Sequence, residues 1–121
     1  MILVTVNKPK QFLFVHFIDH VGCEDLQQCR RELETFVPEL DPGFRVITDL
    51  SHLSNFDVSC SAEIAKMMEL LDENKIGTVI RVIPDPSKDF GLTILALFHY
   101  RRPITTITCK TLVEAAEHLS E

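Results

Sequence analysis

The densest group of polar side chains in the sequence lies in the segment 47–64, between an apolar run and a helical pattern. A hydroxyl at a helix start can satisfy free backbone N–H groups, so Ser59 or Ser61 is a candidate N-cap. The positive end of the helix dipole would equally stabilise a phosphate on that hydroxyl. The chemistry of this segment therefore allows either a simple cap or a phosphoserine switch at Ser59.

The same segment suggests thiol chemistry as a further hypothesis. A cysteine near a helix start, such as Cys60, can have a lowered thiol pKa and act as a nucleophile. His52 could serve as its base, with Asp49 or Asp57 orienting the imidazole. Three such residue types within a dozen positions form a weak pattern, and we predict that the protein is not an enzyme.

Two other groups of residues could bind ions. His16 and His20 share a strand face at a spacing that a metal could use, but no third ligand is evident, so we predict neither a metal nor a cofactor. Arg101 and Arg102 follow a predicted helix, and Arg81 lies in a neighbouring strand. These three guanidinium groups could contact an acidic partner or a phosphate.

The elements that must position these side chains follow from hydrophobic spacing. Short runs rich in β-branched and aromatic residues predict five strands, namely 2–6, 12–18, 44–50, 78–83 and 104–109. Apolar residues at helical spacing predict four helices. The first runs from 24 to about 37, the second follows a polar loop over 51–59 and ends at Asn74, the third runs from 90 to about 100, and the fourth spans 111–119. The last helix opens with a capping box from Thr111 to Glu114.

The predicted order is β-β-α-β-α-β-α-β-α, which defines an α/β protein. Strands that alternate with helices favour a mostly parallel or mixed sheet flanked by about four helices, with the first strand antiparallel at one edge. Sites in such sheets tend to lie beyond the carboxyl ends of the strands. The loops after Leu50 and Ile83 are therefore the places to expect a binding surface.

Composition limits the class of protein. The 121 residues are 45% hydrophobic and 25% charged, as expected for one globular domain spanning 1–121. The net charge of −6 opposes nucleic-acid binding, and no segment approaches the roughly 20 apolar residues that cross a membrane. Without an export leader or a Cys-x-x-Cys pair, we predict a cytoplasmic protein with reduced thiols. Strand 2–6 is expected at the edge of the sheet, where an unpaired strand can pair with a second copy of the chain, so a homodimer is an open alternative.

The segment 49–60, which reads DLSHLSNFDVSC, resembles the loop of the STAS, or SpoIIAA-like, superfamily of bacterial anti-sigma-factor antagonists. In that family a strand ending in Asp-Leu leads to the tetrad Asp-Ser-Ser-Gly. The tetrad's aspartate falls on Asp57, and the serine that a partner kinase phosphorylates falls on Ser59. Val58 replaces the first serine and Cys60 replaces the glycine. The order of elements and the last helix are also similar to the family's.

The resemblance implies a SpoIIAA-like domain that works as a non-enzymatic regulatory or signalling module. Its partner would be a protein, such as a kinase-like anti-sigma factor or a similar regulator, and phosphorylation of Ser59 would switch the binding. The expected partner-binding residues are Asp49, Asn55, Asp57, Ser59, Cys60 and Ser61. The alternative is a domain of the same fold that binds a small apolar ligand or lipid beneath the predicted helix 90–100.

Overall fold

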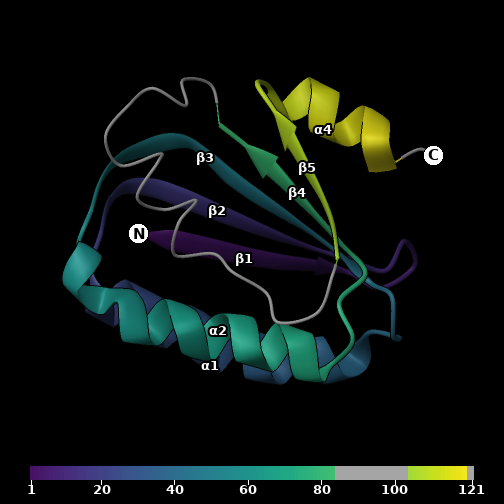
Figure 1. Ribbon diagram of the computed structural model, residues 1–121, viewed down its shortest axis with the longest axis horizontal. Coiled ribbons are helices and arrows are strands. Elements are labelled where there is room, and N and C mark those ends of the chain that lie inside the picture. The colour runs from purple at the N-terminus through teal and green to yellow at the C-terminus, as the bar shows by residue number, and fades with distance from the viewer. Residues whose placement is uncertain (84–103, 120–121) are drawn as a thin grey trace.

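The computed structural model describes residues 1–83 and 104–119, which form an α/β domain with one five-stranded mixed sheet (Figure 1). The strands lie in the order β1-β2-β3-β4-β5. Their bounds are Ile2–Asn7, Phe12–Val21, Arg45–Phe56, Thr78–Val82 and Thr105–Cys109. The helices are α1 (Cys23–Phe36), α2 (Ser61–Glu73) and α4 (Leu112–Leu119), with short 3-10 helices η1 (Val37–Glu39) and η2 (Val58–Cys60).

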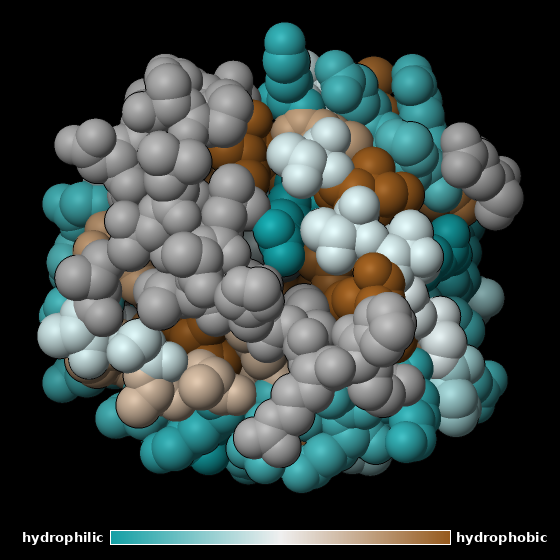
Figure 2. Space-filling model, viewed as in Figure 1, coloured by the Kyte–Doolittle hydropathy of each residue, from teal (hydrophilic) through white to brown (hydrophobic). Residues whose placement is uncertain are grey.

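The helices cover opposite faces of the sheet. Helices α1 and α2 lie side by side against one face, and α4 lies on the other, beside β4 and β5 (Figure 1). The larger core fills the space under α1 and α2 and includes the fully buried Phe17 and Leu26. A smaller cluster, which includes Ile80 and Ala115, forms under α4. In Figure 2, apolar side chains show near the centre of the view and hydrophilic ones dominate its rim.

The predicted antiparallel pairing of the first strand at one edge of the sheet is confirmed, and it forms a hairpin with the second strand. Strand β1 pairs antiparallel with β2 at the edge of the sheet, and all other neighbouring strands pair in parallel. Its tight turn closes with the amide of Gln11, which donates to the carbonyl of Lys8 at 3.2 Å. Gln11 adopts a positive φ of 57°. The parallel strands β2, β3 and β4 are joined by crossovers that contain α1 and α2.

The prediction of about four helices is not matched. The described residues form three α-helices, and the predicted helix 90–100 lies outside them. The predicted capping box at the last helix is present in part, because the amide of Glu114 donates to Oγ1 of Thr111 at 3.2 Å. Within the described part of the chain, no helix combines the length and the apolar character that a membrane span needs.

Strand β3 is longer than predicted, because the expected polar loop 51–59 continues as strand as far as Phe56. The reason is tertiary: β2 extends to Val21, and β3 pairs with it over that whole length. The register shifts twice along this pair. At the first shift His16 pairs with Asp49 and Ile18 with His52, so β3 contains one extra residue there. Such a β-bulge changes which face a following side chain occupies.

Candidate functional site

The predicted switch residue lies where β3 ends and α2 begins, at the left of Figure 1. Asp57 is the N-cap of η2, and its Oδ1 accepts hydrogen bonds from the amide of Ser59 at 3.0 Å and from the Ser59 hydroxyl at 2.6 Å. The amide of Asp57 donates to the carbonyl of Val21 at the end of β2. Asp57 is therefore the cap, whereas the sequence suggested Ser59 or Ser61 for that role.

The side chains around this cap form an exposed polar surface. The hydrogen bonds from Ser59 lower the pKa of Asp57 below its usual value, and the nearby imidazole of His20 contributes in the same direction. His20 in turn forms a hydrogen bond to Oδ1 of Asn55. We call this region the Asp57–Ser59 surface, and its exposed members are His20, Asn55, Asp57, Ser59 and Ser61.

The structure corrects the expected chemistry of two cysteines. Cys60 forms a disulfide with Cys23 at the start of α1, with a Cα–Cα distance of 5.3 Å, and Cys60 is 2% exposed. Neither residue has a free thiol, and the proposed Cys–His–Asp arrangement is absent because His52 contacts His16 and Ser51 instead. Sequence reasoning missed this pair because its members lie 37 residues apart on different elements.

The other two cysteines are free thiols, as predicted, and the structure buries both of them. Cys29 in α1 and Cys109 at the end of β5 are both free and buried. Burial, together with the charge of Glu32, raises the pKa of the Cys29 thiol to about 12. Burial also raises the pKa of Cys109, with a contribution from Glu114 and Glu117. Both thiols should therefore be poor nucleophiles near neutral pH.

We expect iodoacetamide to label no cysteine of the native protein in the absence of reductant. After unfolding without reductant it should label Cys29 and Cys109, and after unfolding with reductant it should label Cys23 and Cys60 as well. Peptide mass spectrometry would assign each label. Rapid labelling of Cys60 in the native, unreduced chain would contradict this account.

Asp49, expected at the partner surface, is 1% exposed. Its Oδ1 accepts hydrogen bonds from the Ser51 amide at 2.9 Å and from the Ser51 hydroxyl at 2.6 Å. Its Oδ2 lies 3.5 Å from Nε2 of His16, which is 2.9 Å from Nδ1 of His52. The structure thus removes Asp49 from the partner surface and pairs His16 with His52, where the sequence paired His16 with His20.

The predicted anion contacts are only partly described. Arg81 lies in β4 opposite Thr48 of β3 and is half-buried. Arg101 and Arg102 lie outside the described residues. That these three guanidinium groups contact an acidic partner or a phosphate therefore stays a prediction.

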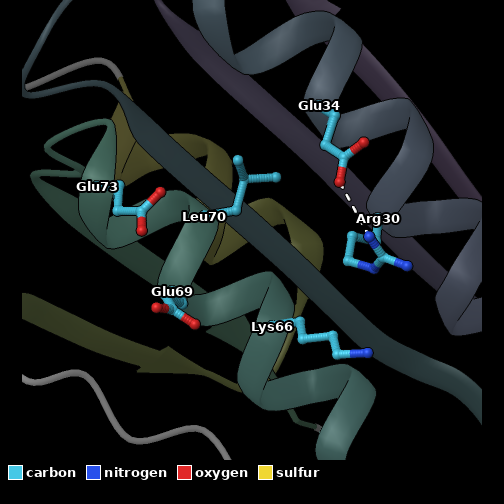
Figure 3. Close-up of a pocket in the computed structure, with 6 residues that line it drawn as sticks. All are labelled: Arg30, Glu34, Lys66, Glu69, Leu70 and Glu73. Carbon is cyan, nitrogen blue, oxygen red and sulfur yellow. Dashed lines mark hydrogen bonds and ion pairs between the residues drawn. The ribbon is translucent and has the colours of Figure 1, made fainter.

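A surface groove of about 300 Å³ lies between α1 and α2 (Figure 3). Arg30 from α1 reaches into the space between the helices and pairs with Glu34 at 3.0 Å. The groove is lined by charged residues and one leucine, namely Arg30, Glu34, Lys66, Glu69, Leu70 and Glu73. Such a lining does not suit an apolar ligand or lipid.

Comparison with known proteins supports the fold. No protein-family model and no curated protein matches the chain. Among solved structures, the anti-sigma factor antagonist SpoIIAA in its unphosphorylated form matches with a TM-score of 0.68 at 15% identity, covering 99% of this chain and 98% of that one. An uncharacterised protein with a SpoIIAA-like fold from Shewanella loihica matches with a TM-score of 0.69 at 14% identity, covering 98% and 92%.

A third solved structure, an anti-sigma factor antagonist from Mycobacterium paratuberculosis, matches with a TM-score of 0.59 at 15% identity, covering 100% of this chain and 94% of that one. These identities are low, and the agreement extends over nearly the whole of each chain. The chain therefore has a SpoIIAA-like fold, as the segment 49–60 and the order of elements indicated.

Proposed function

We propose that this chain is a non-enzymatic regulatory protein that binds a protein partner through the Asp57–Ser59 surface. The observation that carries the proposal is the exposed Ser59 hydroxyl, held at 2.6 Å by the capping carboxylate of Asp57. It lies at the carboxyl end of β3, where parallel sheets place their sites. The retained contact residues are Asn55, Asp57, Ser59 and Ser61, all of which are exposed.

Phosphorylation of Ser59 would act directly on this cap. The Ser59 hydroxyl donates its proton to Asp57, and a phosphoester has no such proton. The added phosphate carries nearly two negative charges at neutral pH, which would repel the Asp57 carboxylate. The modification would thus replace an attraction with a repulsion and rearrange the surface that the partner contacts. The solved structures similar to this chain include a Bacillus SpoIIAA in its phosphorylated form.

The partner that fits this proposal is a kinase-like anti-sigma factor or a similar regulator in the cytoplasm. Such a protein would contact the surface in its unmodified state and would also phosphorylate it. The arginines Arg81, Arg101 and Arg102 are proposed as anion contacts only. Binding of an apolar ligand remains the alternative, since its expected cover, the segment 90–100, lies outside the described residues.

Phosphosite mapping tests the switch. The chain is purified from its own cells under several growth conditions, as wild type, Ser59→Ala and Ser61→Ala, and its phosphates are mapped by mass spectrometry. We expect a phosphate that Ser59→Ala removes and that Ser61→Ala, the matched control, retains. A phosphate that survives in Ser59→Ala, or none under any condition, would contradict the switch.

The hydrogen bond from Ser59 should be visible in the titration of Asp57. Removing the hydroxyl in Ser59→Ala takes away the largest cause of the lowered pKa, so the pKa of Asp57 should rise toward its usual value. Because the folded-state pKa is lowered, the bond stabilises the fold above the unfolded-state pKa, and this stabilisation is lost as the pH falls through the folded-state pKa. Carboxyl-carbon NMR would follow the titration.

Ser61→Ala is again the control, because the Ser61 hydroxyl is not among the groups that shift the pKa of Asp57. An Asp57 pKa that is equal in wild type and Ser59→Ala would show that the hydroxyl does not bond to the carboxylate in solution.

A further inference from the structure

Two histidines and a buried carboxylate converge on one face of the sheet, apart from the Asp57–Ser59 surface. Nε2 of His16 lies 2.9 Å from Nδ1 of His52 and 3.5 Å from Oδ2 of Asp49. All three potential ligand atoms lie within 4.8 Å of one another. The ring of His16 also makes an edge contact with Phe14, which packs against the apolar cluster under α4.

The β-bulge in β3 builds this arrangement. In a regular strand, residues 49 and 52 would point to opposite faces of the sheet. The extra residue in β3 puts His52 opposite Ile18 while Asp49 stays opposite His16, so both side chains occupy the face of His16. Bulges are found next to functional sites because they redirect a side chain in this way.

The carboxylate of Asp49 is held in an orientation that suits a ligand. The two hydrogen bonds from Ser51 occupy its Oδ1 and leave Oδ2 directed at His16. An outer residue that orients a coordinating carboxylate is a regular feature of metal sites. A carboxylate that is 1% exposed also needs a positive partner, and His16, its ion-pair partner among the described residues, is charged only when protonated.

We propose that His16, Asp49 and His52 bind a divalent zinc-class metal ion. Zinc bonds of about 2.0 Å in tetrahedral geometry place neighbouring ligand atoms about 3.3 Å apart. The distances of 2.9 Å and 3.5 Å around Nε2 of His16 lie on either side of that value. His52 is exposed, so water can occupy the fourth position. Three protein ligands with one open position are typical of zinc sites that bind a further small ligand.

Calorimetric titration of the chelator-treated, unreduced full chain with Zn²⁺ tests the site. We expect one ion per chain in the wild type. His52→Ala changes an exposed side chain, so it should fold normally. Because it removes a ligand, its affinity for Zn²⁺ should fall by more than the roughly ten- to hundredfold that the loss of an outer orienting residue costs. Ser51→Ala, which releases the orienting hydrogen bond, should weaken binding by a smaller factor. His20→Gln, which changes a histidine outside the proposed site on the strand of His16, is the matched control and should bind Zn²⁺ as the wild type does.

Titration with Co²⁺ identifies the ligand atoms. Co²⁺ bound tetrahedrally by nitrogen and oxygen ligands shows absorption bands in the visible range. It lacks the ultraviolet thiolate-to-cobalt band that coordination by Cys29 or Cys109 would produce. Saturable binding of one ion that His52→Ala weakens supports the site. The proposal is overturned by the absence of saturable binding, by an affinity that His52→Ala leaves unchanged, or by a thiolate band.

Discussion

Removing the disulfide between Cys23 and Cys60 should lower the free energy of unfolding by about 4 kcal/mol, the value expected for a closed loop of this length. The two residues are 37 positions apart in sequence, so the bond restricts a long stretch of the unfolded chain. It also joins the start of α1 to η2, next to the capping residue Asp57. Urea unfolding of Cys23→Ala/Cys60→Ala, compared with the wild type, would measure the loss.

Reductant provides the matched control for this prediction. The wild type should lose stability on reduction, and the double variant should not respond, because its remaining cysteines, Cys29 and Cys109, form no disulfide. Intact mass should show the unreduced wild type lighter than the reduced chain by two hydrogens. Equal unfolding midpoints for oxidised and reduced wild type would show that the bond does not stabilise the fold.

Gly77→Ala should destabilise the protein by roughly 1–3 kcal/mol, the usual cost of overpacking. A Cβ at this position would lie 2.7 Å from the carbonyl oxygen of Gly43 and 3.0 Å from two further backbone atoms of that residue. Backbone atoms cannot rotate away as a side-chain end can. The contact is close because the amide of Gly77 donates to the carbonyl of Phe44, while the amide of Gly43 donates to the carbonyl of Lys75.

Gly22→Ala is the control for the effect of a methyl group. Its Cβ would lie 3.4 Å from Nε2 of His20, at the end of an exposed side chain, and Gly22 has a φ of −114°, which alanine adopts readily. Thermal unfolding of both variants should show a clear loss for Gly77→Ala and a much smaller change for Gly22→Ala. Similar losses in the two variants would contradict the close approach at Gly77.

Local patterns predicted those parts of the fold that depend on local forces. The β-branched and aromatic runs 2–6 and 12–18 were enough to predict two strands, the first of them antiparallel at the edge of the sheet. Alternation of strands and helices was enough to predict the parallel pairing of the later strands, which the structure confirms. The same pattern placed Asp57 and Ser59 just before the second helix, and in the structure they do precede α2, although β3 extends further toward them than predicted.

Features that depend on distant parts of the chain could not be predicted. The polar residues 51–56 resemble a loop, but they form strand because β2 extends alongside them as far as Val21. The bulge that brings His52 to the face of His16 arises from the pairing of β2 with β3, and the residue pattern of neither strand alone indicates it. The disulfide joins cysteines that become neighbours only when α1 packs beside η2. In each case tertiary packing overrides the local pattern.

Site-directed photo-crosslinking in cells that make the protein would test the central claim most directly. A photoreactive residue is placed at position 61, within the Asp57–Ser59 surface, or at position 73, an exposed position at the other end of α2. We predict one discrete protein adduct from position 61, none from position 73, and loss of the first adduct in Ser59→Asp. Equal adducts from both positions, or an adduct that Ser59→Asp leaves unchanged, would contradict partner binding through this surface.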